Sequence, residues 1–195
     1  FPDVCYNRYV KTHDMGRSRN MMTLLSRFGV AGFNSPVGNK WTVYKRLEKV
    51  PEIQAHLPET RLLQPPEVLV DLLRKYRGVY IKPVNGCKGR DIKKVTRSAG
   101  GYLVKSNGYG RGKIAASPRE TYNSVRSGNW GERLIAQQAI PVLSGQNHFD
   151  IRVMVQKDRS NQWLATGVAA RVGGRGQVTT NLHTGGHAER VEKVL

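Results

Sequence analysis

The sequence predicts an α+β fold, and three observations support this class. Apolar residues recur with helical spacing in several segments of the first two thirds, whereas the last third consists mainly of long strand-like segments. A short turn separates two of these long segments, which is typical of an antiparallel hairpin. The elements do not follow the strict strand–helix–strand repetition of a doubly wound sheet.

Short strands and amphipathic helices are expected in the first third of the chain. Helices are predicted at residues 18–28 and 40–50, because the apolar residues of each recur on one face. Gly29 is a suitable end for the first helix, and Pro58 interrupts the chain after the second. Strands are predicted at residues 1–10, 30–34 and 59–63.

The middle of the chain carries the clearest helix signals. Leucines recur with helical spacing within residues 66–76, which predicts a helix there. Ser117 and Glu120 form a capping box around a proline, so a second helix is predicted over residues 118–127. Strands are predicted at residues 79–82, 92–96 and 101–105, and a glycine-rich loop at residues 107–113.

The last third is expected to be rich in strands. Strands are predicted at residues 133–140, 149–157 and 162–174, and at residues 178–186, which lead into a loop. Alternation along the second strand places Asp150 and Arg152 on one face, and Arg171 lies on the following strand. These three side chains could therefore converge on one site. A structural ion pair between Asp150 and an arginine is the alternative interpretation.

The charge pattern indicates an anionic partner. The chain carries 32 Lys and Arg against 14 Asp and Glu, a net charge of +18, and the basic residues are spread along it. Residues 82–113 contain nine Lys or Arg and one acidic residue, Asp91, among glycine-rich loops. Glycines let backbone N–H groups approach a phosphate, but a solvated basic hairpin would have the same composition. Neither the P-loop pattern nor a dinucleotide-binding glycine pattern occurs there.

Several other chemistries find little support. Two cysteines, Cys5 and Cys87, are too few for a disulfide framework, and no base can be named that would activate Cys87. Glycines between His183 and His187 disfavour a helical two-histidine metal site. No apolar run approaches the roughly 20 residues of a membrane helix, and no signal peptide is visible. Because the sequence starts without methionine and stops in a helix-like run, we expect it to be a segment of a longer protein.

An ordered set of segments resembles the ATP-grasp superfamily. The segments are PDVCYNR, FNSPVGNKWTVYKRL, LPET, YIKPVNGCKGRDI, IAQQAI, FDIRVMVQK, AARVG and TNLHTGG. The set is similar to the YheC/YheD endospore coat-associated group, and its last part also resembles RimK-type ligases. The resemblance implies an ATP-grasp fold of two α+β lobes with antiparallel sheets, incomplete at both ends. Residues 1–35 would end a preceding domain, residues 36–145 would form the first lobe with phosphate loop and hinge, and residues 146–195 would begin the second lobe.

The resemblance also implies roles for individual residues. Lys40 and Lys82 would bind phosphate oxygens of ATP, and a flexible loop would close over the phosphates at Gly86, Cys87, Lys88 and Gly89. The hinge strand would pair with the adenine edge through Gln137, Gln138 and Ile140. Asp150 would lie near the ribose or the substrate. The terminal phosphate and an acyl-phosphate would face Arg152, Arg171 and Asn181.

The implied activity is that of an ATP- and Mg²⁺-dependent carboxylate–amine ligase. The magnesium ligands, including a Glu-x-Asn motif, would follow TNLHTGG beyond Leu195, and no Glu-x-Asn occurs in the sequence. The segment alone is therefore expected to bind ATP without turnover. Its expected partners are ATP, unidentified carboxylate and amine substrates, and spore coat proteins, with no membrane contact, in the cytoplasm or the spore coat.

Two alternatives to the ligase remain. The chain could belong to a nucleotide-binding or structural coat protein that keeps the ATP grip without chemistry. It could also be a basic nucleic-acid-binding module. Aromatic residues make up only 8% of the sequence and are scattered, which disfavours the nucleic-acid module.

Overall fold

The computed structural model describes residues 2–8, 15–34, 37–86, 89–107, 112–128, 131, 133–144, 147–174 and 176–195. Its contacts divide the chain into two compact units. Unit 1 comprises Phe1–Leu57 and Val84–Cys87, and unit 2 comprises Pro58–Pro83 and Lys88–Leu195. The domain boundaries expected from the sequence stay predictions.

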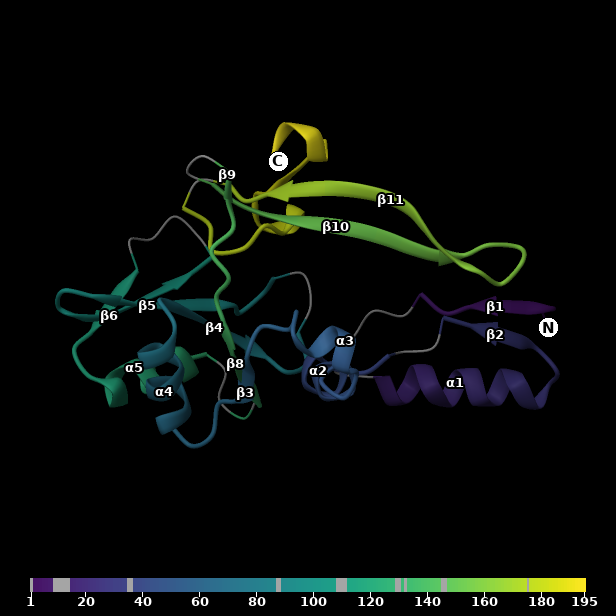
Figure 1. Ribbon diagram of the computed structural model, residues 1–195. Helices are drawn as coiled ribbons and strands as arrows, with labels where there is room; N and C mark the ends of the chain where they lie inside the picture. The colour runs from purple at the N-terminus through teal and green to yellow at the C-terminus, as the bar shows by residue number, and fades with distance from the viewer. Residues whose placement is uncertain are drawn as a thin grey trace. The chain divides into compact units, whose positions relative to one another are not determined.

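Unit 1 contains a small parallel sheet and three helices (Figure 1). Its elements are β1 (Val4–Tyr6), α1 (Met15–Arg27), β2 (Ala31–Phe33), α2 (Lys40–Leu47) and α3 (Pro51–Gln54). The rings of Tyr6 and Phe33 stack on the small sheet with centroids 4.8 Å apart. The helix predicted over residues 40–50 ends earlier, at Leu47. Pro51 opens a separate short helix, because proline suits the first helical turn but not a helix interior.

Unit 2 is built on a six-stranded antiparallel sheet with the strand order β3-β8-β4-β5-β6-β7. The strands are β3 (Thr60–Leu62), β4 (Gly78–Pro83), β5 (Lys93–Ser98), β6 (Gly101–Ser106), β7 (Lys113–Ala115) and β8 (Leu134–Gln138). Helices α4 (Glu67–Lys75) and α5 (Pro118–Arg126) lie against one face of it (Figure 1). Ser117 accepts a hydrogen bond from the Glu120 N–H at 3.2 Å, which confirms the predicted helix cap.

The two faces of this sheet differ sharply in polarity. The face toward the helices is apolar and forms the core, which includes Leu69, Leu72, Leu73, Val79, Ile81, Val95, Val104, Val125 and Ala136. Alternation places Tyr80 and Lys82 on the opposite face. The strand register extends this polar face in one row across four strands, through Gln137, Tyr80, Lys94 and Lys105.

A second antiparallel sheet in unit 2 has the order β12-β11-β10-β9. It consists of β9 (Leu143–Ser144), β10 (Asn147–Lys157), β11 (Trp163–Val172) and β12 (His187–Glu189). The predicted hairpin of the two long strands is confirmed, because β10 pairs with β11 along their length. Asp158 closes the turn by accepting hydrogen bonds from the N–H groups of Ser160 and Gln162 at 2.8 and 2.9 Å.

The strand predicted at residues 178–186 is wrong. This segment is irregular and contains a short 3-10 helix, η2 (Leu182–Thr184), and the strand that pairs with β11 after it is β12. Gly185 has φ +90°, and Gly186 has no space for a Cβ, which would lie 2.6 Å from the Thr180 carbonyl oxygen. These glycines impose a turn where the apolar–polar alternation suggested a strand. The helix-like end of the sequence contains only a second 3-10 helix, η3 (Val191–Lys193).

Candidate nucleotide-binding site

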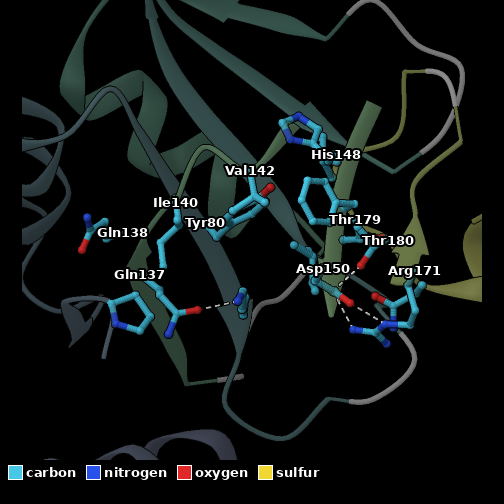
Figure 2. Close-up of a pocket in the computed structure, with 16 residues that line it drawn as sticks. Tyr80, Gln137, Gln138, Ile140, Val142, His148, Asp150, Arg171, Thr179 and Thr180 are labelled. Atoms are coloured by element: carbon cyan, nitrogen blue, oxygen red, sulfur yellow. Dashed lines mark hydrogen bonds and ion pairs between the residues drawn. The ribbon is translucent and has the colours of Figure 1, made fainter. Parts of the chain in front are cut away.

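A cavity of about 380 Å³ lies in unit 2 and contains Lys82, after which we name it the Lys82 cavity. Residues that the sequence singled out line it together: Lys82, Gln137, Gln138, Ile140, Asp150, Arg171 and Asn181. In Figure 2, the hinge residues Gln137, Gln138 and Ile140 lie on one side of the cavity, away from Asp150 and Arg171. The fold thus brings together residues that are far apart in the sequence, from Lys82 to Asn181.

Lys82 is held in position by the hinge strand. Its Nζ donates a hydrogen bond to Gln137 Oε1 at 2.5 Å, and Gln137 Nε2 donates to Thr60 Oγ1 at 2.8 Å. The Lys82 ammonium also lies 5.3 Å from the centroid of the Tyr80 ring. Gln137 therefore acts as a polar link that keeps the cation of β4 beside the cavity (Figure 2).

The hinge after β8 is fixed to residue 59 from both directions. The Gln138 N–H donates to the Glu59 carbonyl oxygen at 2.8 Å, and the Glu59 N–H donates to Gln138 Oε1 at 3.2 Å. The Ala139 N–H donates to the Gly78 carbonyl oxygen at 3.0 Å. Ile140 follows, and then Pro141, which has no N–H. Within the described residues, no hydrogen bond of the protein engages the backbone N–H of Ile140.

Glu59 is in turn anchored by a small polar network. Its carboxylate accepts hydrogen bonds from Lys75 Nζ at 2.5 Å and from the Tyr76 hydroxyl at 2.7 Å, and it pairs with Arg61. The hydrogen bonds from Lys75 and Tyr76 lower the pKa of Glu59 from 4.5 to about 2, although burial opposes this shift. At neutral pH the Glu59 carboxylate is therefore ionised, and its contacts with Lys75 and Tyr76 connect the hinge to the end of α4.

Asp150 and Arg171 form an ion pair at the other side of the cavity (Figure 2). Arg171 Nε and Nη2 donate to the two carboxylate oxygens at 2.7 and 2.6 Å, and the Thr180 hydroxyl donates to Oδ2 at 2.5 Å. Burial tends to raise the pKa of Asp150, but the hydrogen bonds from Arg171 and Thr180 outweigh it and hold that pKa below its usual value. Asp150 and Arg171 are directly opposite on β10 and β11 and form the structural ion pair that the sequence left open as the alternative. Convergence of Asp150, Arg152 and Arg171 on one functional site stays a prediction, because Arg152 does not line the Lys82 cavity.

A second cavity, of about 400 Å³, is lined by Arg152 and shares Arg171 with the Lys82 cavity. Arg152, Arg171 and Asn181, the three residues expected to face a terminal phosphate, line it together, and we name it the Arg152 cavity. His183 also lines it, a contribution that the sequence did not suggest. Arg171 and Asn181 line both cavities, so the two spaces adjoin there.

Asn107 is a positioning residue that the sequence did not reveal. Its Nδ2 donates to the Gly89 carbonyl oxygen at 3.0 Å and to Thr179 Oγ1 at 2.9 Å, while its Oδ1 accepts from the Val178 N–H at 3.2 Å. Gly89 has φ +74°, and a Cβ there would lie 3.0 Å from Asn181 Cγ. The end of the glycine loop is therefore attached to the segment that carries Asn181. An asparagine in a glycine-rich stretch gives no sequence signal of such a role.

The other residues expected at the phosphates belong to unit 1 or are not described. Lys40 and Gly86 belong to unit 1, where Lys40 Nζ donates to the Gly86 carbonyl oxygen at 2.6 Å. Cys87 and Lys88 lie outside the described residues. The roles expected for these four residues stay predictions.

The described residues do not form a magnesium site. Magnesium is usually held by one or two carboxylates together with substrate phosphates. Among the described lining residues of both cavities, Asp150 is the one carboxylate, and Arg171 and Thr180 already bind it. No group of three or more His, Cys, Asp or Glu side chains in the described part of the chain could hold a metal ion. The magnesium ligands expected beyond Leu195 stay a prediction. In the same part of the chain, no helix is long and apolar enough to cross a membrane.

Two curated proteins share substantial sequence with this chain. The endospore coat-associated protein YheD of Bacillus subtilis (strain 168) is 30% identical over 176 residues, which cover 88% of this chain and 39% of YheD. The endospore coat-associated protein YheC of the same organism is 24% identical over 196 residues, covering 96% of this chain and 53% of YheC. The chain thus spans about half or less of the length of these relatives.

Solved structures and a family match complete the comparison. The crystal structure of D-cycloserine synthetase DcsG aligns with this chain at a TM-score of 0.50 and 14% identity, and the alignment covers 97% of this chain and 60% of the DcsG chain. The ATP-grasp ligase PsnB, complexed with minimal precursor, covers 88% of this chain and 54% of its own at a TM-score of 0.33 and 15% identity, which is too weak to bear on the fold. The family described as YheC/D like ATP-grasp matches residues 29–195. With its antiparallel sheets and this match over most of its length, the chain belongs to the YheC/D-like ATP-grasp family, as its sequence resemblance indicated.

Proposed function

We propose that unit 2 binds ATP, with the adenine and ribose in the Lys82 cavity and the terminal phosphate toward the Arg152 cavity. The observation that carries this proposal is that two neighbouring cavities share Arg171 and Asn181 as lining residues. The Lys82 cavity combines the apolar side chains of Ile92, Ile140 and Val142 with cations that include Lys82 and Arg171. The neighbouring cavity adds a second arginine, Arg152. This combination of apolar and cationic groups matches the two ends of a nucleoside triphosphate.

The adenine end is proposed at the hinge. Ile92, Ile140 and Val142 line this part of the cavity and offer apolar surface to a flat base. The Ile140 N–H supplies a donor to the ring nitrogen at the base edge. Because Gln138 and Ala139 use their N–H groups within the protein, the hinge can donate only at one position, which favours recognition of a defined edge of the base.

The phosphate end is proposed at the cations of β4, β10 and β11. The Lys82 ammonium acts as a point charge for the phosphates nearer the ribose, and the guanidinium groups of Arg152 and Arg171 face the terminal phosphate. The Asp150 ion pair leaves the second Nη atom of Arg171 for a ligand, since Nε and Nη2 bind the carboxylate. Asp150 is thus assigned the role of orienting Arg171.

In the complete protein, we propose a carboxylate–amine ligase chemistry. A carboxylate oxygen of the substrate attacks the terminal phosphorus of ATP, the bond to the β-phosphate oxygen breaks, and an acyl-phosphate and ADP form. A neutral amine then attacks the acyl carbon, the bond between that carbon and the phosphate oxygen breaks, and the nitrogen loses a proton to the departing phosphate, so that an amide and inorganic phosphate result. The residues of this chain contribute by holding the phosphates in line and neutralising the charge that develops on them, and no nucleophilic side chain is needed. Magnesium, where bound, would add charge neutralisation.

The second candidate function is a nucleotide-binding coat protein without chemistry. It is favoured by the engagement of Asp150 with Arg171 and Thr180. Both relatives are named as endospore coat-associated, so we propose association with the spore coat under either function. Nucleotide binding is common to the two candidates, and turnover by the complete protein separates them.

Nucleotide binding is tested by calorimetric titration of ATP against tripolyphosphate at equal ionic strength. ATP should bind more tightly, because base recognition adds to the phosphate contacts. Lys82→Ala should weaken ATP binding by roughly 1.5–3 kcal/mol, the usual size of a hydrogen bond to a charged group. Lys113→Ala is the matched control, because the Lys113 side chain is 68% exposed and lines neither cavity. Equal affinities for the two ligands, or equal losses in the two variants, would rule out the proposed site.

A further inference from the structure

A third cavity in unit 2, of about 200 Å³, is lined by basic residues that the proposed ATP site does not use. Lys94, Thr96, Lys105 and His148 line it, together with the glycine-containing loop after β11, and we name it the Lys94 cavity. His148 and Val178 line both this cavity and the Lys82 cavity, so the two are neighbours. Its volume is below the roughly 300–1,000 Å³ typical of pockets for larger ligands.

Two lysines lie side by side on the wall of this cavity. Lys94 on β5 and Lys105 on β6 are directly opposite in the antiparallel register, so their side chains leave the same face of the sheet. Like charges in such a cross-strand pair destabilise a sheet. The register therefore places two like charges next to each other at a partly buried position. A neutral residue in place of either lysine would remove this repulsion.

A third basic group completes the cluster. His148 Nε2, on β10, lies 3.4 Å from Lys94 Nζ. Among the described lining residues of the cavity none is Asp or Glu, and neither lysine forms an ion pair within the described part of the chain. On the side of β4, the Tyr80 ring lies 5.5 Å from Lys94 Nζ and supplies only a weak attraction through its π-face. The protein thus provides three basic groups and, among the residues described, no counter-charge.

The protonation behaviour of the cluster agrees with this geometry. Burial lowers the pKa of Lys94, and the charge of Lys105 lowers it further. Burial and the charge of Lys94 lower the pKa of His148, while a hydrogen bond with the Val142 backbone acts in the opposite direction. An anion between these groups would oppose the lowering at both.

We propose that the Lys94 cavity binds a small phosphate-class oxyanion at a site separate from the phosphates of ATP. Lys94 and Lys105 would hold it by charge-assisted hydrogen bonds, and His148 would donate through Nε2 when protonated. Gly174 and Gly176 also line the cavity, and a glycine permits a close approach of an anion to its backbone because it has no side chain beyond Cα. His148 lines both this cavity and the Lys82 cavity. Binding of an anion here should therefore change the affinity of the Lys82 cavity for ATP.

The proposal is tested by calorimetric titration of inorganic phosphate against chloride at equal ionic strength, in the absence of nucleotide. Lys94→Gln and Lys105→Gln should each weaken phosphate binding by at least about tenfold, equivalent to ~1.4 kcal/mol. Lys113→Gln should have no such effect, since Lys113 is exposed and pairs with Glu120. Lys82→Gln should retain this binding event, which distinguishes the Lys94 cavity from the proposed ATP site. Glycerol phosphate is titrated in parallel. Binding of glycerol phosphate would indicate a site for a terminal phosphate group, whereas binding of inorganic phosphate alone would indicate a site for the free ion.

A stability measurement guards against variants that bind poorly because they fold poorly. Without phosphate, Lys105→Gln should raise the unfolding temperature, because the repulsion with Lys94 is removed. Phosphate should then stabilise the wild type more than this variant. In NMR titrations, with His148→Gln assigning the signal, phosphate should raise the pKa of His148. Equal phosphate shifts in the wild type and both lysine variants would mean an adventitious ion only, and loss of binding in Lys82→Gln alone would place the ion at the ATP site. Either result would overturn the proposal.

Discussion

Asp150 accepts hydrogen bonds from both Nε and Nη2 of Arg171, at 2.7 and 2.6 Å, from the directly opposite position on β11. This fork fixes the plane of the guanidinium group beside two cavities. A carboxylate used in this way is poorly suited to bind a metal ion or a ribose. The relationship therefore favours an indirect role for Asp150, in which it acts on the ligand through Arg171.

Asp150→Asn should consequently weaken ATP binding without removing a direct ligand contact. Asparagine can accept only one of the two hydrogen bonds from Arg171, so the guanidinium loses its fixed orientation. We expect a loss of about 1–2 kcal/mol in ATP affinity, at the low end for charged hydrogen bonds because the Asp150 side chain is 41% exposed. Calorimetric titration measures this loss.

Two further variants test whether the orientation of Arg171 causes the loss. Asp71→Asn serves as the control, since the nearest basic groups lie 4.0 Å from its 53% exposed side chain and it lines neither cavity. Arg171→Lys should reduce affinity at least as much as Asp150→Asn, because lysine keeps the charge but cannot form the fork. If Asp150→Asn binds ATP as the wild type does, Asp150 does not orient Arg171 for the nucleotide.

Glu59 should give the hinge a pH-dependent stability. Its pKa is lowered from 4.5 to about 2, so its ionised form is preferred in the folded chain. The resulting stabilisation is fully present above pH 4.5 and is lost as the pH falls toward 2. Glu59→Gln should therefore destabilise the protein by about 1–2 kcal/mol at pH 7, and progressively less below pH 4.5.

Urea unfolding of wild type and variant from pH 7 down to the acid limit of folding measures this difference. Glu192→Gln is the matched control, because the Glu192 side chain is 76% exposed and its contact with Arg190 is 3.7 Å long. A difference between wild type and Glu59→Gln that stays constant with pH would mean that the carboxylate charge is not what anchors the hinge.

Local sequence patterns predicted the elements whose stability is local. The capping box at Ser117, the leucines of α4 and the turn between β10 and β11 each act within a few residues of chain. The strand expected at residues 178–186 failed because Gly185 and Gly186 turn the chain there, and because the side chains of this segment bind distant partners. Thr179 contacts Asn107, and Thr180 contacts Asp150. The members of these pairs are 72 and 30 positions apart, so a short sequence window cannot contain both.

The candidate site shows the same division. The ordered family segments suggested Lys82, Gln137 and Arg171, which the fold brings to one cavity. Tyr80, Asn107 and His148 were missed, because their importance depends on strand register and on loop contacts. Only the register reveals that Tyr80 and Lys94 are opposite each other, and that Lys94 in turn faces Lys105. Pairing of this kind is set by the topology of the sheet rather than by nearby residues.

Gly89 provides a test of the link between the glycine loop and Asn181. Its φ of +74° favours glycine, and an added Cβ would lie 3.0 Å from both Cγ and Oδ1 of Asn181. Gly89→Ala should thus carry two effects: backbone strain of roughly 1–2 kcal/mol, and displacement of the Asn181 side chain. Because Asn181 lines both cavities, the displacement should lower ATP affinity as well as stability.

Gly128→Ala separates these two effects. Gly128 has φ +83°, and nothing lies within 4 Å of a Cβ added there, so alanine at this position introduces the strain alone. In urea unfolding, both variants should lose the free energy of unfolding that corresponds to the backbone strain. Gly89→Ala should lose more than Gly128→Ala, because it also displaces Asn181. Only Gly89→Ala should also lose ATP affinity in calorimetric titration. Equal ATP affinities in the two variants would show that the contact between Gly89 and Asn181 does not matter for the nucleotide, and that Asn181 can be displaced without affecting the site.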